Sequence, residues 1–326
     1  MSDQILIVGG AGYIGSHVAL AFAETGAQVT VLDNLSTGRR SNLQEGMELI
    51  EGDILDPAQL AQVFERTWDG VVHLAALKAA GESMLEPEAY ARQNLIGSLN
   101  LLEAYASQPD SKLIFSSTAA VYGMPQYLPM DEAHPTVPIN FYGYTKLQIE
   151  GYLGWYARLR GLKYAALRYF NAAGYDAQGR ITGLEHNPQN LIPIVMETAL
   201  GQRSELLILG DDYDTPDGTG VRDYIHVSDL ARGHVAAYGH LKQGRENLVI
   251  NLGAGQGYSV QEVVDNSQRI CGRPIPRKVV GRREGDAANV YASAQMAADV
   301  LDWKVQESDL ENMLKSTWDL YIKQNP

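Results

Sequence analysis

The sequence predicts an α/β protein, built on a doubly wound parallel sheet and followed by a smaller C-terminal α/β domain. Three observations support this fold class. Short buried runs alternate with segments of helical periodicity through the first half, and a glycine-rich turn joins the first run to the first helical segment. Near residue 172 the pattern changes to shorter segments around a long polar stretch. We therefore expect one domain at 1–172 and a second mainly at 173–326, with some segments of the second half returning to the first domain.

The elements of the first domain follow in order. "QILIVGG" at 4–10 is an apolar run stopped by glycine, which is typical of a buried strand. Residues 13–25 then carry Ile14, Val18 and Phe22 at helical spacing. Further strands are expected at 27–33, 47–53, 70–76, 112–118 and 163–171, and helices from Pro57, near 87–106 and at 142–160. Strands separated by helices pair in parallel, because the chain must cross over between them.

The second half is less regular. Residues 174–190 are polar and contain glycine, so we expect a loop, and loops of this length are often functional. "ELLILGDDY" (205–213) and "LVINLGAG" (248–255) are predicted strands of the second domain, accompanied by two or three helices.

Composition excludes several classes of protein. With 326 residues, 45% of them hydrophobic and 20% charged, the chain is an ordinary globular protein. A formal net charge of −13 argues against nucleic acid as a partner. No apolar run approaches the ~20 residues that cross a bilayer, and the amino terminus lacks a secretory pattern. Cys271 is the only cysteine, which favours a reducing compartment, so a soluble cytoplasmic protein is expected. The histidines show no metal-ligand spacing, and no metal is expected.

Gly9, Gly12 and Gly15 lie between the first strand and the first helix. A tight turn alone would explain them, but a helix amino terminus also offers N–H groups and a positive dipole end to a pyrophosphate. Gly12 would let the backbone approach the phosphates, and Gly15 would let helix and strand pack closely. This context predicts a Rossmann-type dinucleotide site.

The second strand ends at Asp33, which bears on the choice of dinucleotide. A carboxylate there accepts hydrogen bonds from ribose hydroxyls and repels a 2′-phosphate, which favours NAD over NADP. The basic pair Arg39 and Arg40 follows a few residues later and leaves NADP open.

"FYGYTK" at 141–146 contains a candidate catalytic pair. Tyr142 precedes Lys146 by four residues and shares its helix face, whereas Tyr144 points to another side. A tyrosine titrates near ~10, so a tyrosine base needs its pKa lowered by about three units. A nearby ammonium could supply part of that shift and the positive nicotinamide ring of NAD the rest. A chance pair on a solvated helix is the alternative.

Two residues, rather than one, separate the first two glycines of the turn. This spacing, together with Tyr-x-x-x-Lys, resembles the extended short-chain dehydrogenase/reductase family. Over nearly the whole chain the sequence is similar to the UDP-glucose 4-epimerases of that family, in segments such as "GGAGYIGSH", "HLAALKAAGES", "LRYFNAAG", "DGTGVRDYIHVSDLA" and "RREGD". The resemblance implies interconversion of UDP-glucose and UDP-galactose by transient oxidation at C4, turnover of the keto-sugar and hydride return. It also implies tightly bound NAD and a homodimer.

The resemblance assigns residues to three sets. The catalytic set is Tyr142, Lys146 and Thr118. The cofactor set adds Gly9, Gly12, Tyr13, Ile14, Gly15, Asp33, Asn34, Ser36, Thr37, Gly38, Asp53, Ile54, Leu74, Ala75, Ala76, Lys78, Asn94 and Phe170. The substrate set, besides Thr118 and Tyr142, is Asn171, Asn190, Leu191, Arg222, Arg283, Asp286 and Val290.

Thr118 is placed by the "FSSTAAVYG" segment, where the family uses a hydroxyl to bind the substrate oxygen; a shift of one residue would give Ser117 instead. Sugar nucleotide dehydratases carry acidic residues just after this position. Ala119 and Ala120 stand there in this chain, which disfavours dehydration.

Two arginines fit the implied substrate. Arg222 and Arg283 lie in glycine-containing segments, and arginine suits bidentate contact with phosphate. The alternative is two surface arginines paired with Asp223 and Asp286.

The sequence leaves the preferred sugar undetermined. In the family, the residue four after the Asp of "RREGD" helps to decide whether an N-acetylated sugar fits, and it counts to Val290, or to Tyr291 with a shift of one. Val290 predicts some activity on UDP-N-acetylglucosamine. A pentose or uronate 4-epimerase, a non-catalytic NAD-sensing regulator and a dehydrogenase that releases NADH are the alternatives.

Overall fold

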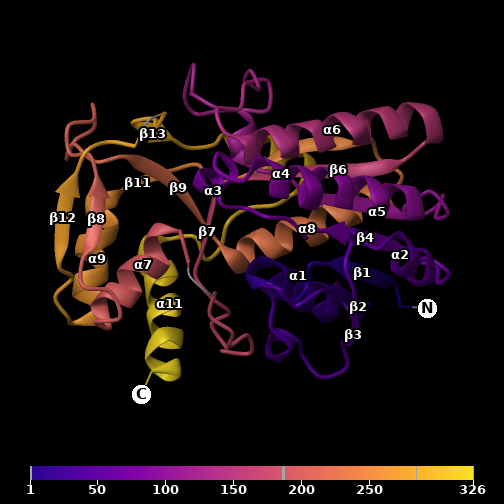
Figure 1. Ribbon diagram of the computed structural model, residues 1–326, viewed down its shortest axis with the longest axis horizontal. Coiled ribbons are helices and arrows are strands. Elements are labelled where there is room, and N and C mark those ends of the chain that lie inside the picture. Colours follow the sequence, from indigo (N-terminus) through magenta and orange to yellow (C-terminus); the bar gives the residue numbers. More distant parts are fainter. Residues whose placement is uncertain (1, 186–187, 284, 326) are drawn as a thin grey trace. The chain divides into compact units, whose positions relative to one another are not determined.

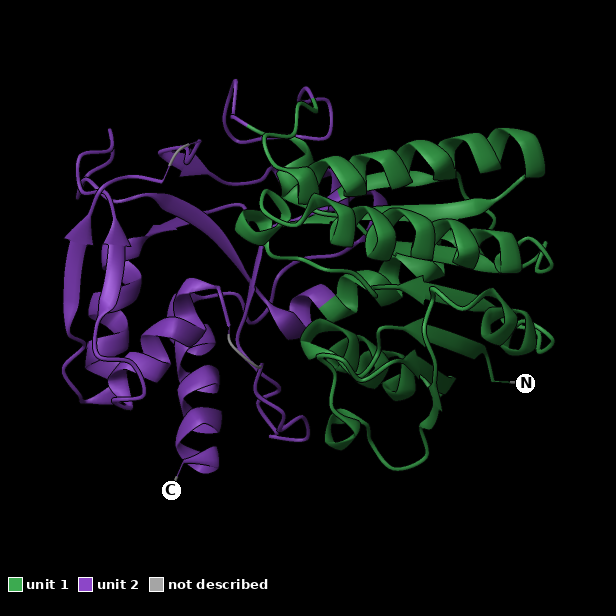
Figure 2. Cartoon of the chain, in the orientation of Figure 1, with its two compact units in different colours: residues 1–123, 136–169, 231–250 green, residues 124–135, 170–230, 251–326 purple. Residues whose placement is uncertain are grey.

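The computed structural model describes residues 2–185, 188–283 and 285–325 (Figure 1). The chain divides into two compact units, coloured in Figure 2. Unit 1 comprises 1–123, 136–169 and 231–250, and unit 2 comprises 124–135, 170–230 and 251–326. Residues 231–250 are thus the part of the C-terminal half that returns to unit 1. The assignment of 124–135 to unit 2 has no counterpart in the sequence-based division.

Unit 1 is built on a seven-stranded sheet, which confirms the predicted fold class. Its strands are β1 (Gln4–Val8), β2 (Gln28–Asp33), β3 (Glu48–Glu51), β4 (Gly70–His73), β5 (Lys112–Ser116), β6 (Lys163–Tyr169) and β10 (Leu248–Leu252). They run in the order β10-β6-β5-β4-β1-β2-β3, and each pair from β6 to β3 is parallel. The strand order reverses beside β1, and ligands of such sheets bind at that switch point.

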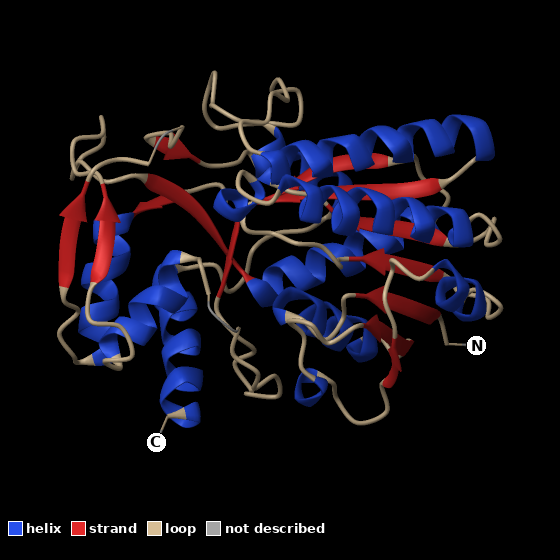
Figure 3. Ribbon diagram, viewed as in Figure 1, coloured by secondary structure: helices blue, strands red, loops and turns tan. Residues whose placement is uncertain are grey.

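Helices connect these strands (Figure 3). They are α1 (Tyr13–Glu24), α2 (Pro57–Val63), α3 (Ala80–Ser83), α4 (Pro87–Tyr90), α5 (Gly97–Tyr105), α6 (Phe141–Arg160) and α8 (Val227–Lys242), with short 3₁₀ turns at Arg40–Asn42 and Ala119–Val121. The helix expected near 87–106 is α4 and α5 joined by a π-helical segment, η2 (Ala91–Ile96). Hydrophobic periodicity cannot reveal that the hydrogen-bond pattern changes within a continuous helix.

The core of unit 1 lies where the helices cover the sheet. Leu6 and Phe115 of the strands pack with Leu60 of α2 and with Leu101 and Leu153 of α5 and α6. All five side chains are buried. Each stabilises the fold by roughly 1.5–3 kcal/mol relative to an exposed position.

The placement of β10 corrects the sequence-based prediction, which gave 248–255 to the second domain. Leu248–Leu252 lies beside β6 at the edge of the unit 1 sheet. An apolar run of this length is compatible with a strand of either unit, and its partner strand β6 lies some 80 residues earlier in the chain. The local sequence therefore predicts the strand and not its sheet.

Unit 2 contains two smaller sheets. β7 (Asn171–Ala173), β9 (Val221–His226), β11 (Gly257–Ser259) and β13 (Asn289–Val290) form one, and β8 (Leu206–Leu209) pairs in parallel with β12 (Arg277–Val280) in the other. The helices α7 (Leu191–Ala199), α9 (Val260–Cys271) and α11 (Leu310–Gln324) share a second core through Val195, Val263 and Leu314. With α10 (Gln295–Leu301) and the start of α8, this half holds more helices than the two or three expected. In 174–185 and 188–190 no helix or strand is formed, as predicted for a loop.

No described helix has the length and apolar character needed to cross a lipid bilayer.

Candidate functional site

Of the three glycines in the turn after β1 that are predicted to bind the cofactor, packing demands Gly9 and Gly15 but not Gly12. A Cβ on Gly9, whose φ is +86°, would lie 2.6 Å from the backbone nitrogen of Ala75, and a Cβ on Gly15 would lie 2.1 Å from the Gly9 carbonyl oxygen. A Cβ on Gly12 would meet only one atom, at 3.6 Å. The protein itself therefore leaves room at Gly12, and a group approaching the α1 amino terminus would use it.

The amino terminus of α1 has the character of an anion site. Gly12 is its N-cap, no side chain caps it, and its first turn carries no acidic residue. Tyr13 and Ile14 form that first turn and are half-buried. The turn, its neighbours and the helix dipole all fit a pyrophosphate.

Asp33 holds the turn together from the end of β2. Its Oδ2 accepts the N–H of Ala11 at 2.9 Å, and its Oδ1 accepts the N–H of Leu35 at 2.8 Å. A Cβ on Gly38 would lie 2.9 Å from the same Oδ1, so the 35–38 loop closes over the carboxylate. Each oxygen keeps a further lone pair, which a ribose hydroxyl could use.

A second link joins the ends of β2 and β3. Asn34 Nδ2 donates to Asp53 Oδ2 at 2.9 Å, while Asn34 Oδ1 accepts from both the N–H and the hydroxyl of Ser36. Ile54 is buried and Thr37 is exposed. The residues predicted for the adenosine end thus form one connected edge of unit 1.

Asn94 lies in the π segment and is fully buried. Its Oδ1 accepts the Leu77 N–H at 2.9 Å, and its Nδ2 donates to the Leu77 carbonyl at 3.0 Å and to Thr145 Oγ1 at 3.1 Å. The amide therefore fixes the loop segment beside Lys78 and the helix that carries Tyr142. Its geometry is that of a positioning residue. Leu74 and Ala75, which precede this segment, donate their N–H groups to Val8 of β1.

α6 brings the candidate catalytic tyrosine to the end of β5. Asn140 caps the helix by accepting the Gly143 N–H at 2.8 Å. A Cβ on Gly143 would lie 2.4 Å from the Ala120 carbonyl oxygen, so only glycine permits this close approach. The Thr118 side chain lies close enough to Tyr142 to act on the pKa of its hydroxyl, which it lowers.

The alternatives to these two residues point elsewhere. Tyr144 is 44% exposed and stacks on Phe141. Ser117 donates its hydroxyl proton to Glu150 at 2.5 Å. Glu150 also forms a buried ion pair with Arg168. The geometry therefore supports Thr118 and Tyr142.

Lys146 is buried beside this pair. Its Nζ donates to the Ser116 carbonyl at 2.8 Å and lies 6.0 Å from the centroid of the Tyr142 ring. Burial lowers the pKa of Lys146 to about 7 and raises the pKa of Tyr142 to about 12, although Thr118 works against the latter shift. In the ligand-free chain, loss of hydration therefore outweighs the effect of Thr118 on the tyrosine.

In unit 2, two predicted phosphate contacts share one carboxylate. Arg222 Nη2 donates to Asp286 Oδ1 at 2.6 Å, and Arg283 Nη2 lies 3.4 Å from Asp286 Oδ2. The pairing with Asp286 that the sequence left as an alternative is therefore present. Two cations and one anion still leave an excess positive charge, which suits a diphosphate.

Val290 is paired with Arg222 in the β13–β9 register, so the two residues lie on the same face of the sheet. The ring of Tyr291 lies toward β11, where a Cβ on Gly257 would approach it to 3.6 Å. Asn190 and Leu191 lie at the start of α7, whose N-cap Asn190 makes no side-chain capping bond.

The comparisons with known proteins agree with this arrangement. The model of the NAD dependent epimerase/dehydratase family matches residues 5–253. The chain belongs to this family. Among its relatives, the UDP-glucose 4-epimerase of Halalkalibacterium halodurans is 45% identical over 99% of this chain and 96% of its own length. The resemblance inferred from the sequence is confirmed.

Solved structures of epimerases give the same result. The UDP-glucose 4-epimerase from Brucella ovis in complex with NAD matches with a TM-score of 0.95 and 43% identity, covering 98% of both chains. The enzyme from Bifidobacterium longum in complex with NAD+ and UDP matches with a TM-score of 0.93 and 39% identity, covering 99% of both.

Sequence reasoning missed the role of one acidic residue in the "DGTGVRDYIHVSDLA" segment. Asp223 follows Arg222 and was considered only as its partner, but its fully buried carboxylate accepts the N–H groups of Ala254, Gly255 and Ala292. Burial raises its pKa to about 6, against the effect of those bonds. Among the described residues, no cluster of side chains could hold a metal ion.

Proposed function

We propose that this epimerase-family protein interconverts UDP-glucose and UDP-galactose through a transient 4-keto sugar, with NAD held throughout the cycle. The observation that carries the proposal is the convergence of Tyr142, Thr118 and Lys146 at the switch-point end of the unit 1 sheet. NAD, when bound, supplies the hydride acceptor at sugar C4 and returns the hydride afterwards.

The residues of the cofactor set would hold NAD, and the turn at Gly12 fits its pyrophosphate. Because burial keeps the Tyr142 hydroxyl protonated, the protein's own groups hold this proton in the resting state. Thr118 would orient the sugar hydroxyl, and Tyr142 would receive its proton only as the phenolate, after the tyrosine's own proton has passed to water and an added positive charge stabilises the anion. Lys146 provides a cation whose charge can change near neutral pH.

The two residues after Thr118 explain why the protein should not dehydrate the sugar. Elimination of water needs an acid and a base beside the keto-sugar, and Ala119 and Ala120 supply neither. The keto-sugar must then be reduced again. For the other face of the keto-sugar to meet the hydride, the hexose must turn while the nucleotide stays bound. Most of the binding energy should therefore come from contacts with UDP. Arg222 and Arg283 would supply it.

The test is direct. Purified protein incubated with UDP-galactose, without added NAD, should form UDP-glucose, and release of NADH at the reduced-nicotinamide absorbance band should be absent. A strict requirement for stoichiometric NAD would favour the dehydrogenase alternative. Profiling UDP-pentoses and UDP-uronates in the same assay separates the other 4-epimerases that share the nucleotide anchor.

We also propose turnover of UDP-N-acetylglucosamine. Its support is the register that sets Val290, rather than Tyr291, on the Arg222 face of β13. A Val290→Tyr variant should lose the acetylated substrate and keep UDP-galactose. Unchanged turnover of both substrates would refute the assignment.

A cytoplasmic homodimer completes the proposal. On α6, Trp155 is 59% and Leu159 is 74% exposed, and the two residues share a helix face. An apolar stripe on a long helix suits a second copy of the chain. Light scattering should give twice the 35.7 kDa of one chain, and cell fractionation tests the compartment.

A further inference from the structure

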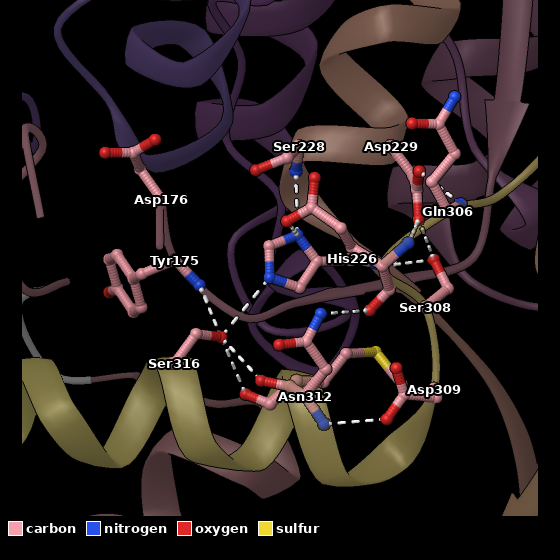
Figure 4. Close-up of polar contacts among 12 residues, drawn as sticks. Tyr175, Asp176, His226, Ser228, Asp229, Gln306, Ser308, Asp309, Asn312 and Ser316 are labelled. Carbon is pink, nitrogen blue, oxygen red and sulfur yellow. Dashed lines mark hydrogen bonds and ion pairs between the residues drawn. The ribbon is translucent and has the colours of Figure 1, made fainter. Parts of the chain in front are cut away.

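A buried hydrogen-bond centre lies where β9 passes into α8 (Figure 4). His226 is the last residue of β9, and its ring has no exposed surface. Its Nδ1 accepts the N–H of Ser228 at 3.1 Å. A neutral ring with an accepting Nδ1 carries its proton on Nε2, which lies 3.2 Å from the hydroxyl of Ser316 and donates to it.

Ser316 joins three parts of unit 2 through one oxygen. Besides the bond from His226, its Oγ accepts the N–H of Tyr175 at 3.2 Å and donates to the Asn312 carbonyl at 2.9 Å. A hydroxyl accepts two hydrogen bonds and donates one, so its capacity is filled. The end of β9, helix α11 and the chain just after β7 therefore meet at this atom.

The His226 ring also packs directly on the backbone after β7. A Cβ on Gly174, where φ is +79°, would lie 2.3 Å from the ring Cδ2. β7 has three residues and pairs with β9 in the register Asn171↔Tyr224 and Ala173↔His226. Its far end is held by Asn171 Nδ2, which donates to the Asp223 carbonyl at 2.8 Å. The ring and Ser316 hold the near end.

The backbone of His226 is fixed as well. Ser308 Oγ accepts the backbone N–H of His226 at 2.8 Å and donates to Asp229 at 2.6 Å. The Asp229 carboxylate also accepts the N–H groups of Gln306 and Glu307 at 2.8 Å each. The imidazole is therefore clamped between α11 and the start of α8.

A serine, a histidine and the Glu307 carboxylate, 3.8 Å from Nδ1, follow one another here, as in a nucleophilic triad. The arrangement does not serve that chemistry. The ring is fully buried, its Nδ1 accepts from Ser228, and Ser316 donates to its own helix. Its remaining role is structural control over β7.

We infer that His226, acting through Ser316, is a positioning residue that presents Asn171 to the nucleotide diphosphate of the substrate. The inference rests on the proposed function, in which Asn171 contacts that group. One amide proton of Asn171 is committed to Asp223, and β7 decides where the rest of the amide points. Loosening the near end of β7 should weaken nucleotide binding and leave the chemistry at the sugar unchanged.

The experiment compares Ser316→Ala with Ser267→Ala. Ser267 is a fully buried helix serine in α9 whose hydroxyl bonds only the Val263 carbonyl four residues earlier, so it matches the lost group without touching β7. Ser316→Ala should raise KM for UDP-galactose, and the Kd of UDP measured by calorimetry, by about 5- to 10-fold, the worth of about one hydrogen bond. The kcat should stay close to that of the parent protein.

Two histidine variants distinguish the roles of the two ring nitrogens. His226→Gln keeps a donor toward Ser316 and should retain most of the UDP affinity, whereas His226→Asn keeps only the acceptor for Ser228 and should resemble Ser316→Ala. Equal losses in Ser316→Ala and Ser267→Ala, or a loss of kcat at constant Kd, would overturn the inference. If the parent protein neither binds UDP nor converts UDP-galactose, the proposed function fails instead.

Discussion

The proposed catalytic and anchoring residues of this epimerase-family protein differ in how their charges are stabilised. In unit 1, Lys146 is 2% exposed and its pKa falls to about 7, so its charge is costly to maintain. In unit 2, the Arg222 side chain is 18% and the Arg283 side chain 61% exposed, and both arginines already share Asp286. Burial allows the charge of Lys146 to change near neutral pH, whereas pairing with Asp286 keeps two permanently charged arginines in place for a second anion.

The largest expected effect is that of Tyr142→Phe. Removing the hydroxyl that exchanges the sugar proton should lower kcat by about 10²–10⁴-fold, while the Kd of UDP stays unchanged. Tyr144→Phe, which removes an exposed hydroxyl two residues away, is the matched control and should behave as the parent. Full activity in Tyr142→Phe would show that this hydroxyl does not exchange the sugar proton.

Lys146→Met should abolish most turnover and also change how stability depends on pH. In the ligand-free parent, the folded chain loses the Lys146 proton near pH 7 while the unfolded chain keeps it until about 10.5. Lys146 should therefore make the free energy of unfolding increase between about pH 7 and about pH 10.5, by at most about 5 kcal/mol. Lys146→Met should lack this rise in chemical-denaturation series. A parallel dependence in both proteins would mean that the lysine is not desolvated.

Arg222→Ala tests the anchoring side of the comparison. Charge-assisted hydrogen bonds are worth about 1.5–3 kcal/mol, so KM for UDP-galactose should rise about 10- to 100-fold. A fall in kcat without a change in KM would place Arg222 with the catalytic residues.

Arg283→Ala should have the smallest effect, because its pairing with Asp286 is long and its side chain is exposed. We expect less than about a 5-fold rise in KM at physiological salt, vanishing at higher salt. An effect as large as that of Arg222→Ala would show that substrate binding buries both arginines equally.

Local pattern was enough to predict much of unit 1. Apolar runs, ended by glycine or aspartate in the first three cases, predicted β1 to β6 within a few residues, and the four-residue spacing selected Tyr142 over Tyr144. These features depend on neighbours in the chain. The resemblance placed Thr118, and the structure added that Ser117 is committed to Glu150.

Other features depend on contacts between distant residues and could not be predicted. β10 joins a strand far earlier in the sequence, and the Asn94 amide is committed to Leu77 and Thr145. The pKa of Tyr142 depends on how much water the folded chain removes, which spacing does not report. The role of His226 was missed for the same reason, since Ser316 lies 90 residues away.

The π segment between α4 and α5 has a consequence for insertions and deletions. Upstream of its end, Asn94 faces Leu77; downstream, Leu101 and Leu102 face the core. A regular α-helix with the same number of residues would turn one of these faces by about 100° relative to the other. Deleting one residue within 91–96 would convert the wide turn to an α-helical one and keep both faces in place, whereas an α-helix of unchanged length would lose either the polar clamp or the packed interior.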